Sequence, residues 1–231
     1  MSSPATLPGI HIREHTSVLA PAEKRLLVWI AERLPARLVS DHLTGLALVS
    51  MVAAGCSFAA IRLTRWAALG VVMALVVKWF GDSLDGTLAR VRRQERPRYG
   101  FYVDHVIDLA GAALLLGGLA CSGAMDPLIA LALLSAYLMV AAESFLSTHA
   151  AGTFRLSCFG FGPTELRLVL IAGALRLIRG PWASLGPFGR HRLFDVGGVI
   201  AIVGLATVFL VSALGTARLL YRLEPPARER R

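Results

Sequence analysis

Residues 66–90, WAALGVVMALVVKWFGDSLDGTLAR, decide the class of fold to which this chain belongs. The first fifteen of these residues are apolar except for Lys78, whereas the last ten carry Asp82, Asp85 and Arg90. A helix rises about 1.5 Å per residue, so a run of this length can cross about 30 Å of hydrocarbon. Ionisable residues in such a helix are costly and usually mark a functional site. The stretch therefore predicts a membrane-spanning helix with a polar site at one end.

The composition of the whole chain agrees with this prediction. Of its 231 residues, 55% are hydrophobic and only 17% are charged, and the mean hydropathy is +0.62. A soluble protein of this size would need more polar residues to cover its surface. We therefore expect an integral membrane protein.

Apolar runs of about 20 residues recur along the chain and predict six spans. They lie at residues 43–61, 66–90, 101–121, 127–146, 164–178 and 196–214, the last continuing to 221. The short segment PAEKRLLVWIAERL, at residues 21–34, is too charged to span. It places Leu26, Leu27, Ile30 and Leu34 on one helical face, which is typical of a helix lying in the membrane interface.

The predicted fold is thus an all-α integral membrane protein with about six transmembrane helices and an N-terminal interfacial amphipathic helix. We divide the chain into an arm and juxtamembrane helix (1–40), a six-helix transmembrane domain (41–222) and a basic tail (223–231). The first forty residues hold no basic segment followed by an apolar core of the signal-peptide kind. We expect the first span to direct the chain into the membrane.

The net charge of +9 has an uneven distribution. Arg and Lys residues are concentrated on the side of the membrane that would hold both termini, and fewer lie on the other side, at Arg62, Arg65, Arg179, Arg190 and Arg192. This asymmetry favours cytoplasmic termini, in the inner membrane if the protein is bacterial. The basic residues lie between apolar runs and form no stripe interleaved with aromatic residues. We therefore expect lipid bilayer rather than nucleic acid as a partner.

A second pair of aspartates follows the first. Residues 99–108, YGFYVDHVID, place Asp104 and Asp108 four apart, while Asp82 and Asp85 are three apart, so each pair shares a helix face. Two adjacent antiparallel helices can point these faces at each other. Converging carboxylates repel each other unless cations hold them, and hard oxygen ligands suit Mg²⁺ or Mn²⁺. We expect two such ions.

These residues carry a resemblance to a known family. The pattern D-x-x-D-G-x-x-A-R followed by G-x-x-x-D-x-x-x-D resembles the signature of the CDP-alcohol phosphotransferases. It is made here by Asp82, Asp85, Gly86, Ala89, Arg90, Gly100, Asp104 and Asp108. The spacer of residues 91–99 is one residue longer than the usual family spacing.

The resemblance implies an enzyme of phospholipid synthesis. Such an enzyme moves a substituted phosphate from a CDP-linked donor to an acceptor hydroxyl and releases CMP. The implied metal ligands are the four aspartates, with Asp108 also acting as the general base. The implied CDP site comprises Asp82, Gly86, Ala89, Arg90 and Gly100. Members of the family are often homodimers.

Residues outside the signature offer further candidates. His105 makes the second half of the signature read D-H-x-x-D, and it is a candidate auxiliary catalytic group, with an interfacial histidine as the alternative. Lys78 lies one turn before Asp82 on the same face, so it either pairs with that carboxylate or extends to the membrane surface. The segment between the fourth and fifth spans is richer in polar groups, and it supplies candidate acceptor-binding residues at His149, Arg155, Glu165 and Arg167. Glu143, an ionisable residue within a span, is a further functional candidate.

Three alternatives stay open at this point. CDP-diacylglycerol is the preferred donor because the six-helix size resembles the bacterial phosphatidyltransferase branch. A soluble CDP-choline or CDP-ethanolamine donor, acting with a diacylglycerol-like acceptor, is favoured by His105 alone. A divalent-cation transporter or a structural membrane scaffold is a remote reading, since neither explains the spacing of glycine, arginine and aspartate residues.

Overall fold

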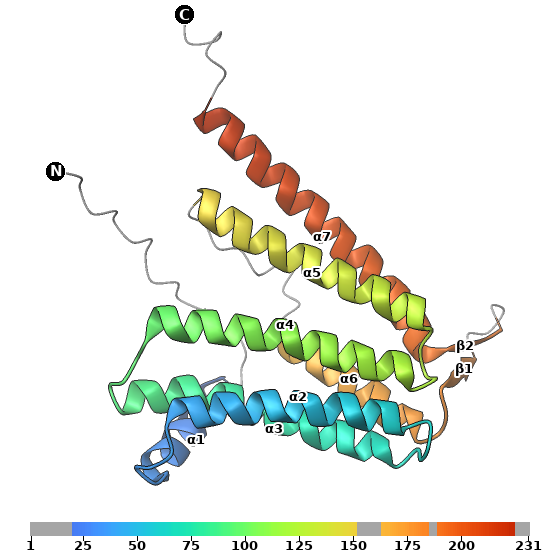
Figure 1. Cartoon of the computed structure of the whole chain (residues 1–231), viewed down its shortest axis with the longest axis horizontal. Coiled ribbons are helices and arrows are strands. Elements are labelled where there is room, and N and C mark those ends of the chain that lie inside the picture. Colours follow the sequence, from blue (N-terminus) through green and yellow to red (C-terminus); the bar gives the residue numbers. More distant parts are fainter. Residues whose placement is uncertain (1–19, 152–162, 185–188, 225–231) are drawn as a thin grey trace, which may run out of the picture.

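The computed structural model describes residues 20–151, 163–184 and 189–224 (Figure 1). Seven helices and two short strands lie in these ranges. They are α1 (Ala20–Arg33), α2 (Ser40–Ala60), α3 (Ala67–Val91), α4 (Pro97–Cys121), α5 (Pro127–Ala151), α6 (Pro163–Leu177), β1 (Trp182–Ser184), β2 (Arg190–Arg192) and α7 (Leu193–Leu223). The predicted helical membrane fold is confirmed.

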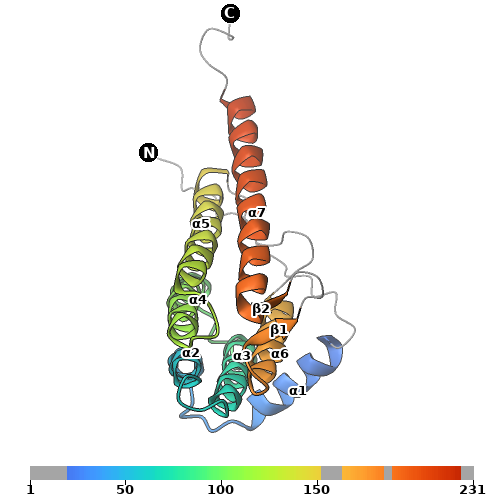
Figure 2. The same cartoon turned by 90° about the vertical axis from the view of Figure 1, so that its right-hand side faces the viewer.

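Successive helices along the chain alternate in direction, so the packed neighbours α2 and α4, and likewise α5 and α7, run parallel to each other. Helix α2 packs against both α3 and α4, and α6 lies on α3. Helix α5 packs on α4, and α7 runs along α5 (Figures 1 and 2). Helix α1 contacts α3 at one end of the bundle, and the two strands lie at the other end. We call these the α1 end and the β end.

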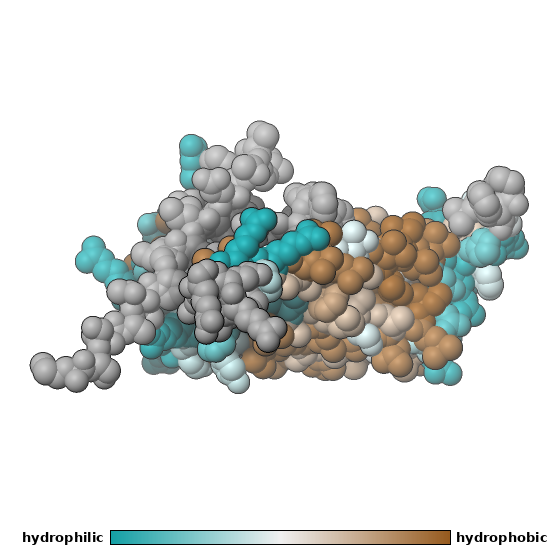
Figure 3. All heavy atoms as spheres, turned by 90° about the horizontal axis from the view of Figure 1, so that it is seen from above, coloured by the Kyte–Doolittle hydropathy of each residue, from teal (hydrophilic) through white to brown (hydrophobic). Residues whose placement is uncertain are grey.

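Five of the helices are long and apolar enough to cross a membrane: α2, α3, α4, α5 and α7. The helix that matches the predicted fifth span, α6, is 15 residues long. The space-filling view shows a broad zone of hydrophobic side chains, with hydrophilic side chains toward both ends of the bundle (Figure 3). This distribution is the one expected of a chain whose middle lies in hydrocarbon.

Two helices extend beyond their predicted ends. Helix α4 begins at Pro97 rather than at residue 101, because proline has a suitable φ and needs no amide partner in a first helical turn. Helix α5 continues past residue 146 to Ala151. There the hydroxyls of Ser147 and Thr148 donate to the carbonyl of Ser144 over 3.1 and 2.7 Å, so these polar residues are accommodated within the helix.

Helices α2 and α4 approach each other closely at two glycines. A side chain at Gly118 would collide with the backbone of Gly55, and one at Gly55 would collide with the carbonyl of Leu114. Close contact between backbones replaces the hydrophobic force that is missing between helices in lipid. The largest cluster of buried side chains lies beside this crossing and includes Phe58, Leu119 and Met125, each at most 1% exposed.

Helix α1 lies against the last turns of α3. Its buried residues Leu27 and Ala31 join Leu43, Leu84 and Leu88 in a second apolar cluster. Leu84 and Leu88 lie within the signature stretch, on either side of Asp85 in sequence. The juxtamembrane helix therefore packs directly on the segment that carries the first pair of aspartates.

The strands β1 and β2 were absent from the predicted fold. They pair antiparallel, with Trp182 opposite Arg192 and Ser184 opposite Arg190. Each strand has three residues, which is too short for an alternating hydrophobic pattern to show in the sequence. This ribbon joins α6 to α7 at the end of the bundle away from the aspartates.

Candidate active site

The four signature aspartates come from two consecutive antiparallel helices, α3 and α4, which both pack against α2. Asp82 and Asp85 lie in the last turns of α3, and Asp104 and Asp108 lie in the first turns of α4. The intervening loop turns at Arg93, whose φ of 54° is left-handed. The amide of Gln94 then bonds the carbonyl of Ala89 over 2.9 Å. This tight turn brings both aspartate pairs to the α1 end.

The loop is also tied to the start of α2. The guanidinium of Arg96 donates to Oδ1 of Asp41, and its plane lies over the ring of Tyr99 at 4.2 Å. The hydrogen bond with Asp41 raises the pKa of Arg96. The longer spacer between the two halves of the signature thus has its own anchor on α2.

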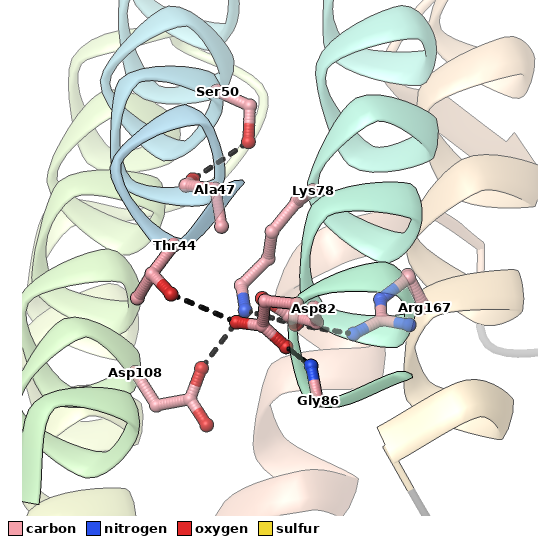
Figure 4. Close-up of polar contacts among 9 residues, drawn as sticks. Thr44, Ala47, Ser50, Lys78, Asp82, Gly86, Asp108 and Arg167 are labelled. Carbon is pink, nitrogen blue, oxygen red and sulfur yellow. Dashed lines mark hydrogen bonds and ion pairs between the residues drawn. The ribbon is translucent and has the colours of Figure 1, made fainter. Parts of the chain in front are cut away.

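Lys78 forms the centre of the polar cluster. Its ammonium donates to Oδ2 of Asp82, four residues on, and to Oδ1 of Asp108 over 2.9 Å (Figure 4). The Lys78 side chain is only 8% exposed, whereas that of Asp108 is 54% exposed. The predicted pairing of Lys78 with Asp82 is confirmed. Its second partner, Asp108, joins α3 to α4.

Arg167 reaches the same cluster from α6. Its guanidinium donates to Oδ2 of Asp82 over 3.3 Å, and its side chain is 17% exposed. Two cationic side chains from different helices therefore share one carboxylate oxygen. The sequence placed Arg167 among the acceptor-binding candidates, and the structure brings it to the first aspartate of the signature.

Asp85 is held by uncharged donors. Its Oδ2 accepts from the hydroxyl of Thr44 over 2.9 Å, and its Oδ1 lies 2.5 Å from the amide of Gly86. The hydroxyl of Ser40 donates to the backbone carbonyl of Asp85 over 3.0 Å. The residue is 8% exposed, so these bonds fix the carboxylate in one position. Sequence reasoning missed Thr44 and Ser40, which lie more than 40 positions away along the chain.

The four carboxylates lie close enough to influence one another. Asp85 lies within range of the negative charges of Asp104 and Asp82, and Asp104 lies within range of those of Asp108 and Asp82. Among the described residues, no group of three or more His, Cys, Asp or Glu side chains is arranged tightly enough to hold a metal ion. Instead, protein donors hold the carboxylates: Lys78 on Asp82 and Asp108, Thr44 on Asp85.

The chemistry of this donor set nevertheless fits a hard divalent cation. Four carboxylates provide eight oxygen atoms on the consecutive helices α3 and α4, and two protein cations already lie against Asp82. Carboxylate oxygen is the ligand that Mg²⁺ and Mn²⁺ prefer. The assignment of the aspartates as metal ligands stays a prediction.

The predicted CDP-binding residues lie on the exposed side of the signature. Gly86 is exposed and has open space where a side chain would project, as does Gly100. Arg90 is exposed and donates to the hydroxyl of Thr87 over 3.3 Å, whereas Ala89 is half-buried. Open backbone beside an arginine can accept a pyrophosphate group.

His105 lies between aromatic rings. Its ring centroid is 4.1 Å from that of Phe101 and 5.5 Å from that of Phe145 on α5. Its Nδ1 is 2.6 Å from the carbonyl of Phe101. These contacts place the imidazole toward α5, one residue from Asp104. Its catalytic role stays a prediction.

The other acceptor-binding candidates are His149, Arg155 and Glu165. His149 is exposed near the end of α5. Arg155 and the side chain of Glu165 lie outside the described residues. Tyr137 of α5, which the sequence did not single out, is electrostatically coupled to Asp108. Its ring therefore adds a hydroxyl from α5 to the surroundings of the fourth aspartate.

Glu143 binds hydroxyl groups of α7. Its Oε2 accepts from Ser212 over 2.6 Å and its Oε1 accepts from Thr216 over 3.3 Å. Glu143 is 9% exposed, and these bonds compensate for burying its carboxylate. In this structure the residue joins two membrane helices.

The comparisons with known proteins agree with the site. The family model of the CDP-alcohol phosphatidyltransferases matches residues 37–215. A crystal structure of the phosphatidylinositol phosphate synthase of Mycobacterium tuberculosis, with CDP-DAG bound, has a similar fold. The two chains are 19% identical, with a TM-score of 0.56, and the match covers 85% of this chain and 94% of that one. No curated protein matches the sequence.

The family match extends over more than three quarters of the chain and includes every residue of the signature. The chain therefore belongs to the CDP-alcohol phosphatidyltransferase family. It is a membrane enzyme of phospholipid synthesis that transfers a substituted phosphate from a CDP-alcohol.

Proposed function

We propose that this enzyme transfers the phosphatidyl group of CDP-diacylglycerol to an acceptor hydroxyl. One observation supports the proposal most directly. Ion pairs join side chains of α3, α4 and α6 at one end of these helices, and the residues involved are Lys78, Asp82, Asp108 and Arg167. The fold is shared with a synthase that was crystallised with CDP-DAG. A lipid-linked donor also suits a site that opens at the end of a membrane bundle.

In the proposed reaction, the acceptor oxygen attacks the phosphorus that bears the diacylglycerol. A new P–O bond forms, the P–O bond to CMP breaks, and its electron pair leaves with CMP. Asp108 takes the proton from the attacking hydroxyl. Its carboxylate is the more exposed partner of Lys78, so one oxygen can face an acceptor while the other holds the ammonium.

A divalent cation is part of the proposal. Asp82, Asp85, Asp104 and Asp108 would hold Mg²⁺ or Mn²⁺, with two ions expected. When bound, the ions neutralise the charge of the pyrophosphate and polarise its phosphorus. Thr44 keeps the Asp85 carboxylate in position for this role.

Positively charged side chains complete the proposed donor site. Arg90 lies near the open backbone of Gly86 and would grip a phosphate with its planar fork. Arg167, already at Asp82, would lie beside the reacting phosphate rather than only in the acceptor site. Ala89 and Gly100 would line the part of the donor site that holds the cytidine group.

We further propose that the site faces the cytoplasm, as do both termini. The support is the distribution of Arg and Lys residues, which are denser in the segments at the α1 end. A water-soluble product, CMP, would then be released on the cytoplasmic side.

A second candidate reaction uses CDP-choline or CDP-ethanolamine with a diacylglycerol-like acceptor. The observation that favours it is His105, which follows Asp104 directly and lies on the α5 side of the site. A positively charged aminoalcohol could also lie against the aromatic rings of Phe101 and Phe145.

The deciding experiment measures CMP release by the purified protein with and without Mg²⁺ or Mn²⁺. The donors are CDP-diacylglycerol, CDP-choline and CDP-ethanolamine, each with a panel of hydroxyl acceptors, and Asp108→Asn serves as the control. We expect metal-dependent release from CDP-diacylglycerol that the control lowers by about 10²–10⁴-fold. Turnover of an aminoalcohol donor alone would replace the proposal with the second candidate. A folded protein that releases no CMP from any donor would contradict both.

A further inference from the structure

We propose that Arg92 is a positioning residue that links the membrane-surface helix α1 to Asp85. Through this link, the seating of α1 on lipid sets the cation affinity of the site. The proposal rests on the proposed function, because it takes Asp85 as a metal ligand. It adds to that function a positioning residue outside the family signature. It also makes the cation affinity of the site depend on contact between α1 and the membrane surface.

Arg92 binds the segment that follows α1. Its guanidinium donates to the carbonyls of Leu34 and Pro35 over 3.0 Å each, to that of Ala36 over 3.5 Å, and to that of Leu38. The last carbonyls of a helix and of the turn after it lack partners within the helix. The planar fork of arginine has five N–H donors in fixed directions and bonds all four of these carbonyls, whereas the compact ammonium of lysine has only three donors.

The same segment leads directly to Asp85. Two residues after Leu38, Ser40 donates to the backbone carbonyl of Asp85, and Thr44, one turn further, donates to its carboxylate. Arg92 itself follows the last residue of α3, the helix that carries Asp85. Asp85 and Thr44 are therefore connected in two ways. Their side chains share a hydrogen bond, and the backbone of α3, Arg92 and the turn before α2 join them indirectly.

Packing adds a second connection between α1 and the site. The inner face of α1, with Leu27 and Ala31, contacts Leu84 and Leu88. Both leucines are at most 1% exposed, and Asp85 lies between them in sequence. A displacement of α1 would have to move these side chains or leave a cavity beside them.

The outer face of α1 fits a lipid surface. Leu26 and Trp29 are each 54% exposed, and the guanidinium of Arg33 lies 4.1 Å from the Trp29 ring. Tryptophan and arginine are the side chains that anchor a helix at the level of lipid headgroups. Helix α1 also ends six residues before the first membrane span, which keeps it at the surface.

These observations describe one connection from the lipid surface to Asp85, made of two successive steps. Apolar anchoring of Trp29 holds α1 in place, and Arg92 transmits that position to the turn that bears Ser40 and Thr44. Removing either residue should loosen Asp85 in the same way. The effects of the two substitutions should therefore overlap rather than add.

The test measures Mn²⁺ binding by electron paramagnetic resonance. The full-length protein is reconstituted in nanodiscs of phosphatidylcholine and phosphatidylglycerol. Arg92→Met should raise the Kd for Mn²⁺ by about tenfold. The matched control is Arg93→Met, which removes the same charge from the neighbouring exposed position and should change the Kd less than about twofold. In CMP release, Arg92→Met should raise the KM for Mn²⁺ and leave kcat at saturating Mn²⁺ near the wild-type value.

The double variant tests the link itself. Trp29→Ser should weaken Mn²⁺ binding in nanodiscs, and adding it to Arg92→Met should produce little further loss. Equal Kd values for the Arg92→Met and Arg93→Met variants, or strictly additive effects of the Trp29 and Arg92 substitutions, would overturn the proposal. If Arg92→Met does not fold, Arg92→Lys is measured instead, because it keeps the positive charge but lacks the planar guanidinium. A Kd for Mn²⁺ equal to that of wild type in Arg92→Lys would then overturn the proposal.

Asp85→Asn distinguishes this inference from the function on which it rests. If wild type and Asp85→Asn bind Mn²⁺ equally, Asp85 is not a metal ligand, and both this inference and the proposed role of Asp85 in the metal site fail, whereas CMP release still tests the transfer reaction. If Asp85→Asn weakens binding but Arg92→Met does not, only the role of Arg92 is overturned.

Discussion

Lys78 of α3 donates a hydrogen bond to Asp108 of α4 over 2.9 Å, so the residue proposed as the general base is held by a cation from the neighbouring helix. The same ammonium contacts Asp82. A lysine buried within a membrane helix must keep a negatively charged partner. Lys78 thus balances part of the charge of the four carboxylates.

The first prediction concerns Lys78→Met, which keeps the length of the side chain and removes its charge. Without the ammonium, Asp82 and Asp108 repel each other. The metal-free protein should lose about 1–3 kcal/mol in its free energy of unfolding. Divalent cations should then bind more tightly and restore the lost stability. Thermal unfolding in EDTA and in Mn²⁺ measures both effects.

Arg62→Met is the matched control for Lys78→Met. It removes one positive charge at the β end, where Arg62 is exposed. Its stability should respond to Mn²⁺ as that of wild type does. A Lys78→Met protein that gains no more stability from Mn²⁺ than the control would contradict the charge-balancing role of Lys78.

A second prediction concerns the hydroxyl of Thr44. Thr44→Val keeps the shape of the side chain but removes the 2.9 Å hydrogen bond to Asp85. We expect a Kd for Mn²⁺ about five- to tenfold higher, which corresponds to the net contribution of a typical intramolecular hydrogen bond. Calorimetric titration with Mn²⁺ measures the change.

Thr207→Val is the control for the Thr44 substitution. The hydroxyl of Thr207 donates to the carbonyl of Val203 within α7, over 2.8 Å. Its replacement should leave Mn²⁺ binding unaltered. Unaltered binding in Thr44→Val as well would show that Asp85 does not depend on α2.

The positions of the helices follow largely from the sequence, because apolar runs of membrane length have few alternative structures. The predicted run at 66–90 corresponds to α3 at 67–91, and the predicted interfacial helix at 21–34 corresponds to α1 at 20–33. The strands β1 and β2 were missed because three residues carry too little periodicity.

The site was predictable only where its contacts are local in sequence. The pairing of Lys78 with Asp82 follows from a separation of four residues on a helix. The contact of Lys78 with Asp108, and that of Thr44 with Asp85, depend on how α3 faces α4 and α2. Such relative rotations are set by packing, including the glycine crossing of α2 and α4, and not by any single motif.

That crossing supplies a third prediction. Gly118→Ala would place a methyl group against the backbone of Gly55, which cannot move without shifting α2. Overpacking of this kind typically costs about 1–3 kcal/mol, so the apparent Tm should fall by several degrees. Thermal unfolding monitored by size-exclusion chromatography measures it.

The adjacent glycine offers the matched control. A side chain at Gly117 would meet nothing within 4 Å, so Gly117→Ala should be neutral or slightly stabilising in a helix. If both alanine substitutions lower the Tm equally, close contact between α2 and α4 is not what Gly118 provides.

The last prediction concerns Glu143, the ionisable residue within a span. Its two hydrogen bonds go to Ser212 and Thr216 of α7, which favours a structural role over acceptor binding. Glu143→Leu should lower the free energy of unfolding by about 1 kcal/mol, because hydrogen bonds between membrane helices are worth little more than that. Ser212 and Thr216 can instead bond their own helix backbone.

Activity decides between the two roles of Glu143. The control within α5 is Ser135→Ala, whose hydroxyl donates to the carbonyl of Leu131. CMP release by Glu143→Leu should stay within about threefold of wild type. A loss of about 100-fold with unchanged thermal stability would mean that the carboxylate contacts the acceptor. In that case the KM for the acceptor should rise more than the KM for the CDP-linked donor, since the contacts of Glu143 lie on α5 and α7 rather than on the signature helix α3.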